Sequence, residues 1–160
     1  MSELPLVYFV CTGNACRSQM AEGWARALFG SHLQVASAGI QPTGLDPRAT
    51  AAMAELGVDI SAQVSKMLDP LLLARADLVI TLCDDADQRC PTTPPQVRRL
   101  HWSVTDPATA SGSPEQVSEV FRQVRDQLRL RIETLPFEFG QTWPLSHPPT
   151  GGLGHDRETL

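Results

Sequence analysis

The stretch Cys11-Thr12-Gly13-Asn14-Ala15-Cys16-Arg17-Ser18 decides the fold, because it lies between an expected strand and an expected helix. Residues 6–10, Leu-Val-Tyr-Phe-Val, form a short apolar run typical of a buried strand, and residues 18–29 carry apolar side chains at helical spacings. Where a strand turns into a helix, several backbone N–H groups lack intrahelical partners and the helix dipole adds positive potential. The stretch therefore predicts a site for a tetrahedral oxyanion.

Cys11 and Arg17 carry the chemistry expected of this loop. The positive field favours the thiolate form of Cys11 and makes it a nucleophile, and the Arg17 guanidinium can bind two oxygens of one oxyanion. The alternative is that Cys11 is an unreactive buried cysteine and Arg17 an ordinary surface residue, but the adjoining strand and helix argue against it. The loop lacks the Gly-Lys-Ser/Thr ending of a nucleotide-binding loop. The other residues of the expected binding site are Thr12, Gly13, Asn14, Ala15, Cys16 and Ser18.

Composition narrows the function classes. The chain has 160 residues, which suits one domain with a substantial core. Its net charge is -5 and its basic residues form no run, so we expect no nucleic-acid partner. It has neither an apolar stretch of about 18 residues nor a signal-peptide pattern, so we expect no membrane association and a cytoplasmic location. In that compartment four cysteines are more often catalytic, redox-active or metal-binding than disulfide-bonded.

Strands alternate with helices along the chain, which predicts an α/β fold. The pattern indicates a three-layer sandwich, in which helices flank a four-stranded, mostly parallel sheet. Proline and glycine near the C-terminus predict a flexible tail over residues 140–160 after a domain over residues 1–139, with Phe139 and Trp143 able to dock on the body. Further strands are expected at 33–39, 77–82 and 97–102, and further helices at 47–56, 68–75 and 113–135.

Three cysteines are expected near one edge of this sheet. Ligands bind at the carboxyl ends of parallel strands, and Cys11 and Cys83 each follow a strand directly. Cys90 lies in the same segment as Cys83, which is rich in Asp, Thr and Pro and predicts one helical turn in a flexible loop. Because thiolates exchange disulfides sequentially, these residues can form a relay in which Cys11 bonds the oxyanion, Cys83 attacks Cys11, and Cys90 attacks Cys83.

Other roles for the cysteines stay open on the residues alone. Cys83 can be a small core residue that ends a strand. A zinc site is a further alternative, although the spacings Cys11-x4-Cys16 and Cys83-x6-Cys90 differ from the usual Cys-x2-Cys pairs. Cys16 is expected to pack inward. A relay suits an oxyanion whose central atom accepts two electrons, and arsenate is the obvious mimic of phosphate.

Asp106 is the expected proton donor. It lies in a loop after a strand, within Thr105-Asp106-Pro107-Ala108, where its carboxyl group can protonate a departing oxygen. The alternative is an aspartate that starts a turn before proline. Ser18 is expected to donate to the Cys11 thiolate or to cap the helix, and Asn14 to adopt a left-handed conformation. His32 and His101 show no partner pattern and are interpreted as structural.

These motifs resemble those of the thioredoxin-coupled arsenate reductases, which share the fold of low-molecular-weight protein tyrosine phosphatases. The resemblance implies that Cys11 is the nucleophile, Arg17 and the loop amides bind arsenate, Asp106 is the acid, and Cys83 and Cys90 form the relay. It also implies reduced thioredoxin as the electron donor, with no cofactor, and we expect a monomer. A mycothiol or glutaredoxin system is the alternative donor. The matching segments are residues 10–24, residues 79–83 with Cys90-Pro91, residues 101–108 and residues 121–126.

Some members of this family bind potassium near the loop, through residues resembling Asn14, Glu22 and Ser37. An acidic residue from the position matching Lys66 completes their site. Since this chain has a lysine there, we expect no potassium binding.

Two other functions compete with this interpretation. In a low-molecular-weight tyrosine phosphatase an aromatic residue normally follows the Asp-Pro pair, whereas Ala108 follows it here. Weak phosphatase activity is still expected, because the loop accepts a phosphoryl group. A non-catalytic thiol sensor is the second alternative, and Arg17 argues against it because such a sensor needs no oxyanion clamp.

Overall fold

A parallel four-stranded sheet forms the centre of the molecule. The computed structural model describes residues 3–146. Within them the strand order is β2-β1-β3-β4 and every neighbouring pair is parallel, which confirms the predicted sheet. The strands are β1 (Leu6–Cys11), β2 (Gln34–Gly39), β3 (Leu78–Thr81) and β4 (Arg98–His101).

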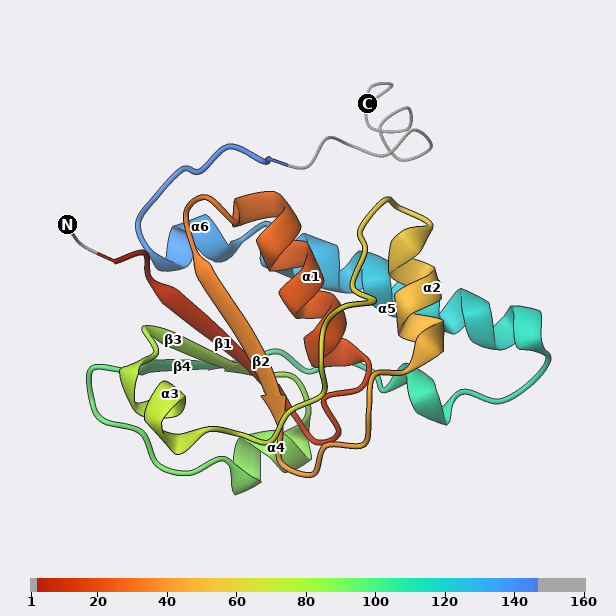
Figure 1. The fold of residues 1–160 in the computed structure, drawn as a ribbon, viewed down its shortest axis with the longest axis horizontal. Coiled ribbons are helices and arrows are strands. Elements are labelled where there is room, and N and C mark those ends of the chain that lie inside the picture. Colours follow the sequence, from red (N-terminus) through yellow and green to blue (C-terminus); the bar gives the residue numbers. More distant parts are fainter. Residues whose placement is uncertain (1–2, 147–160) are drawn as a thin grey trace.

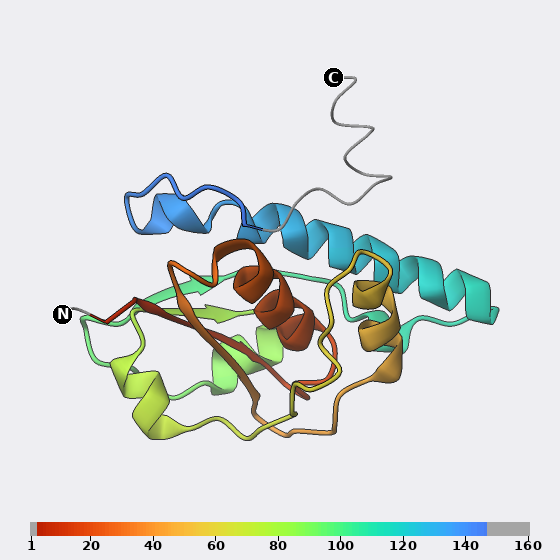
Figure 2. The same ribbon diagram turned by 45° about the horizontal axis from the view of Figure 1, so that its top comes forward.

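Helices cover both faces of the sheet and complete the three layers (Figures 1 and 2). The larger core cluster joins Val7 and Phe9 of β1 to residues of α1, α2 and α5, whereas Leu6 and Tyr8 of β1 face residues of α3 and α4. This alternation follows from the two-residue period of a strand buried on both faces. The helices are α1 (Arg17–Phe29), α2 (Pro47–Ala54), α3 (Pro70–Arg75), α4 (Asp84–Arg89), α5 (Pro114–Ile132) and α6 (Leu135–Glu138).

Side-chain caps fix where several helices begin. Asp46 accepts a hydrogen bond from the Arg48 amide at the start of α2, with Pro47 at the first helical position. Ser113 and Gln116 form a capping box at the start of α5, as the sequence predicts. By contrast, the residue before α1, Cys16, makes no side-chain cap, so its side chain does not compete for the amides of the oxyanion loop.

The structure differs from the predicted elements in two places. Residues 84–89 form the six-residue helix α4, with a capping cysteine at each end, instead of one turn in a flexible loop. Helix α6 was not expected, since Pro136 follows the predicted end of α5, yet proline fits the first turn of a helix.

Residues 140–146, the first part of the expected tail, pack on the body, and the docking expected of Phe139 and Trp143 is confirmed. Trp143 stacks on His32, with ring centroids 5.4 Å apart, and also packs against Phe29 and Phe139. The Ser146 amide donates to the Leu28 carbonyl oxygen at 2.9 Å. The chain therefore packs on the C-terminal end of α1 well past the predicted boundary, while residues 147–160 lie outside the described part of the chain.

Replacing Trp143 tests this contact. We expect Trp143→Ala to lower the free energy of unfolding by about 1–3 kcal/mol, because three ring contacts are lost. Urea denaturation followed by circular dichroism measures the change. Leu145→Ala is the control, because Leu145 is 48% exposed and its truncation should cost less than about 0.5 kcal/mol. Equal stability of the Trp143 variant and the wild type would contradict the packing.

Candidate active site

The Cys11 sulfur lies at the end of β1, held by two donors from its own loop. The Asn14 amide donates to Cys11 Sγ at 3.3 Å, and Ser18 Oγ lies 2.9 Å from it. Because Asn14 Nδ2 already donates to Ser18 Oγ at 2.7 Å, the serine hydroxyl proton is free to point at the sulfur. The sequence predicts this contact between Ser18 and Cys11.

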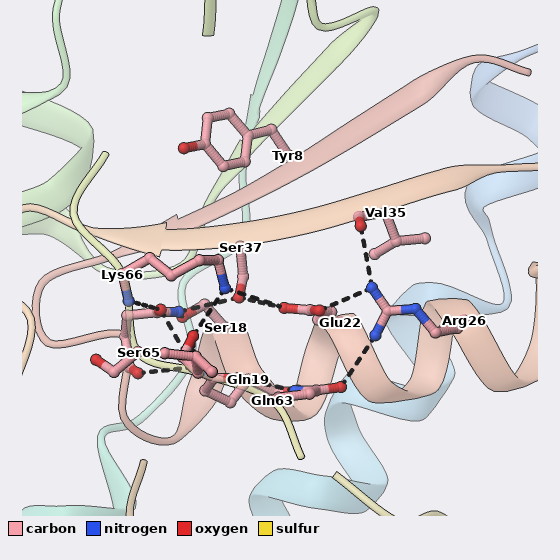
Figure 3. A network of polar contacts seen from close by, with 12 residues as sticks. Tyr8, Ser18, Gln19, Glu22, Arg26, Val35, Ser37, Gln63, Ser65 and Lys66 are labelled. Atoms are coloured by element: carbon pink, nitrogen blue, oxygen red, sulfur yellow. Dashed lines mark hydrogen bonds and ion pairs between the residues drawn. The ribbon is translucent and has the colours of Figure 1, made fainter. Parts of the chain in front are cut away.

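Asn14 shapes the loop from its centre. It has a φ of 48°, the left-handed conformation expected from the sequence. Its buried side chain donates to Ser37 Oγ at 3.0 Å, and its Oδ1 accepts from the Lys66 amide at 2.8 Å and from Gln19 Nε2 at 3.1 Å. Figure 3 shows that Ser18, Ser37 and Lys66 lie close together. The loop is therefore fixed to α1, to β2 and to the segment before α3.

Arg17 extends from the start of α1 along a small pocket. The pocket has a volume of about 240 Å³ and is lined by loop residues together with Asp106 and Ala108. Arg17 Nη1 donates to the Val104 carbonyl oxygen at 3.0 Å. Its Nε is buried and has no partner among the described residues. Since a buried donor costs free energy when it is unpaired, this group is suited to an oxyanion above Cys11.

Asp106 faces the same pocket and also begins a turn. Its Oδ1 accepts from the Ala108 amide at 3.0 Å, which starts a 3-10 turn at Pro107–Thr109. Its Oδ2 lies 3.7 Å from Arg17 Nη2. Asp106 can therefore both start the turn and serve as the proton donor, because the turn orients the carboxyl group while one oxygen remains directed at the pocket.

Cys83 lies beside the oxyanion loop, although 72 positions separate it from Cys11 in the sequence. Its Sγ is 3.2 Å from Thr12 Oγ1 and accepts from the Ala86 amide at 3.4 Å. Thr12 Oγ1 in turn donates to Asp85 Oδ2 at 2.8 Å. With its single proton used there, the threonine oxygen can only accept from the Cys83 thiol. A hydrogen-bonded path thus leads from the thiol to a carboxylate.

Cys90 is buried, although the segment that contains it is rich in polar residues. Gln88 and Arg89 are exposed, while Cys90 packs into the apolar cluster that contains Tyr8 and Leu73. Burial is the main cause that raises the pKa of the Cys90 thiol. This environment keeps Cys90 protonated while α4 is intact.

Cys16 packs inward, as predicted. It is buried in the larger core cluster, and its thiol donates to Asp46 Oδ2 at 3.6 Å. Burial, followed by the Asp46 carboxylate, raises the pKa of Cys16 well above that of a free thiol. Although it lines the pocket, Cys16 is held as a thiol.

Sequence reasoning missed the contacts of His101. Its Nδ1 lies 2.9 Å from Thr81 Oγ1, and its Nε2 lies 2.9 Å from Asp84 Oδ1. Thr81 and His101 are register partners on β3 and β4. The sequence held one indication of this pairing. Thr81 and His101 each lie one residue before the end of a predicted strand, so neighbouring parallel strands place them side by side, at the sheet edge where α4 begins.

Metal-binding clusters and membrane-spanning helices are both absent from residues 3–146. No group of three or more His, Cys, Asp or Glu side chains there could hold a metal ion. No helix in that range is long and apolar enough to cross a membrane.

Comparisons with known proteins identify relatives over most of the chain. Residues 6–141 match the model of the low molecular weight phosphotyrosine protein phosphatase family. An arsenate reductase of Bacillus subtilis is 50% identical over 140 residues, which cover 88% of this chain and 98% of the relative. A solved arsenate reductase in its oxidised state is 36% identical, with a TM-score of 0.72 over 82% of this chain and 96% of its own.

A thioredoxin-dependent arsenate reductase of Corynebacterium glutamicum has the same architecture. It is 28% identical, with a TM-score of 0.67, and the match covers 86% of this chain and 64% of that protein.

Arg17→Lys tests the oxyanion site. Lysine keeps the charge but lacks the planar fork and the buried Nε–H, so we expect the Kd for inorganic phosphate to rise about 10-fold or more. Isothermal titration calorimetry at fixed ionic strength measures the affinity. Arg48→Lys is the control: Arg48 is exposed, pairs with Asp46 and lies outside the small pocket. Equal weakening by both substitutions would assign the effect to the charged surroundings rather than to Arg17.

Proposed function

Because this chain belongs to the low molecular weight phosphotyrosine protein phosphatase family, and within it to the arsenate reductases, we propose that it reduces arsenate to arsenite through Cys11, Cys83 and Cys90. Reduced thioredoxin is the electron donor, as for the Corynebacterium relative. The observation that carries the relay is the position of Cys83, whose sulfur contacts Thr12 of the nucleophile loop. A phosphatase reaction has no use for a second thiol at this place.

The first step is nucleophilic displacement at arsenic. The Cys11 thiolate attacks the arsenic atom of arsenate, an S–As bond forms, and one As–O bond breaks. The buried Nε of Arg17 and the loop amides bind the remaining oxygens. Asp106 protonates the departing oxygen, which leaves as water.

The second step reduces arsenic. The Cys83 thiolate attacks Cys11 Sγ, the S–As bond breaks, and its electron pair stays on arsenic, which passes from As(V) to As(III) and leaves as arsenite. The proton of Cys83 moves toward Asp85 through the Thr12 hydroxyl, along the observed hydrogen bonds. The protein then holds a Cys11–Cys83 disulfide.

The third step requires α4 to unwind. Cys83 and Cys90 cap its two ends, and seven helical steps of about 1.5 Å separate their Cα atoms by about 10 Å, whereas a disulfide needs about 4.4–6.8 Å. Once α4 opens, Cys90 leaves its apolar site and attacks Cys83, which releases the Cys11 thiolate. The Cys83–Cys90 disulfide is then reduced by the dithiol of thioredoxin.

The same proposal includes the setting of the reaction. We place it in the cytoplasm, where thioredoxin is kept reduced, and we expect a monomer. Phosphatase activity is a secondary function, because the loop can bind phosphate. It should be weak, since Ala108 at the pocket edge offers no aromatic surface to a phosphotyrosine ring.

Counting thiols tests the relay. Mixing reduced protein with arsenate and no reductant should consume two of its four thiols per arsenite released, and peptide mapping should find the disulfide between Cys83 and Cys90. Cys90→Ser should also release one arsenite but stop at a Cys11–Cys83 disulfide. Cys83→Ser should release none.

Phosphate in place of arsenate is the matched control, because phosphorus accepts no electrons here and all thiols should remain. Full arsenite release by Cys83→Ser would exclude the relay.

We also propose that Lys66 replaces a bound potassium ion. The Glu22 carboxylate is nearly buried, accepts from Ser37 Oγ at 2.5 Å and pairs with Arg26 at 2.7 Å. Lys66 Nζ lies 4.0 Å from the same carboxylate, as Figure 3 shows. Two cations already balance one carboxylate, so electrostatics oppose a third positive charge at this place.

Potassium dependence tests this proposal. At constant ionic strength, the rate of arsenate reduction should be equal in potassium and choline chloride within about 1.5-fold, since potassium is screened like any bulk salt ion. Lys66→Asp should make the rate rise with potassium, because it adds an oxygen ligand and removes the tethered cation. A potassium-stimulated wild-type rate that Glu22→Ala abolishes would refute the proposal.

A further inference from the structure

Four side chains fasten α4 to the sheet. Thr81 Oγ1, on β3, donates to Asp87 Oδ1 at 2.9 Å and lies 2.9 Å from His101 Nδ1 on β4. His101 Nε2 lies 2.9 Å from Asp84 Oδ1. Asp84 and Asp87 are the first and fourth residues of α4. The helix is thus tied to two strands through both of these carboxylates.

The donors of this network follow from the number of protons available. Thr81 has one hydroxyl proton, and the Asp87 carboxylate can only accept it. The remaining two contacts then join Thr81 Oγ1 and the Asp84 carboxylate to the two ring nitrogens of His101. One histidine ring therefore connects β3 to the first residue of α4.

We propose that Thr81, Asp84, Asp87 and His101 form a clamp that holds α4 helical in the reduced protein and so opposes the Cys83–Cys90 disulfide. The inference rests on the proposed relay, because that disulfide cannot span an intact α4. A six-residue helix is too short to be stable alone, so its contacts with the sheet decide its stability. When α4 unwinds, Asp84 and Asp87 leave His101 and Thr81, and the free energy of those contacts is lost.

Arg99, on the same strand as His101, also holds the end of α4. Its guanidinium donates to the carbonyl oxygens of Asp87 and Pro91. Both β3 and β4 therefore contribute polar contacts to this helix.

The redox equilibrium of the pair tests the clamp. In a Cys11→Ser, Cys16→Ser background, the full chain is equilibrated anaerobically with oxidised and reduced dithiothreitol. Two electrons and two protons pass from the protein dithiol to oxidised dithiothreitol, giving the protein disulfide and reduced dithiothreitol. Thr81→Val should raise the equilibrium constant for protein oxidation about 3- to 10-fold, because hydrogen bonds of the reduced form are lost.

Two further variants and a control complete the test. Thr81 is buried, so Asp84→Asn, at a side chain 80% exposed, provides a variant with little risk to folding and should raise the constant about twofold. Gln88→Lys is the control: it makes the same change in charge on the same helix at similar helix propensity, and it should leave the constant unchanged. His101→Gln should raise the constant as Thr81→Val does.

The comparison of variants separates the clamp from other effects on the relay. Equal constants in all variants would overturn the clamp and leave the relay intact. Failure of the parent to form any Cys83–Cys90 disulfide would overturn both.

Discussion

The hydrogen bonds of one buried asparagine hold the reactive loop in place. Asn14 adopts a left-handed backbone conformation, in which its amide points at Cys11 Sγ and its side chain reaches Ser18 and Ser37. The position of the Ser18 hydroxyl, and so its donation to the sulfur, depends on the Asn14 side chain. Because the same side chain also accepts from the Lys66 amide, the loop, α1, β2 and the segment before α3 are ordered together. Loss of this residue would affect nucleophile geometry and local packing at once.

The oxyanion loop and α1 are held more firmly than α4, and the relay depends on this difference in local stability. The loop and α1 pack against the larger core cluster, whereas α4 has six residues and contributes only Ala86 to the core from its own length. A helix of this length depends on a few polar contacts, so it can open without unfolding the domain. A longer, better-packed α4 would keep Cys90 buried and stop the relay after its second step.

The sequence predicted the fold because its signals were local and consistent with each other. Three of these signals are the continuous apolar run of β1, the capping box at Ser113 and the strand-to-helix turn at Cys11, and each follows from neighbouring residues. The surroundings of Cys90 could not be predicted in this way, since its polar neighbours lie on the other side of a short helix. The contacts of His101 were also missed, because only the tertiary structure brings Asp84 near this side chain and no periodicity indicates it. Docking of Trp143 was expected, although its partners Phe29 and His32 could not be named from the sequence.

Environment, rather than sequence order, assigns the four thiols their different functions. Cys11 contacts Ser18 and the Asn14 amide in its own loop, and Cys83 has a hydrogen-bonded path for its proton. Cys16 is as near to the pocket as either, but burial and a neighbouring carboxylate keep it protonated. Cys90 is protected by burial until α4 opens. A thiol that ionised early would attack the Cys11 adduct out of order. The order of the relay therefore follows from which thiol can lose its proton at each stage.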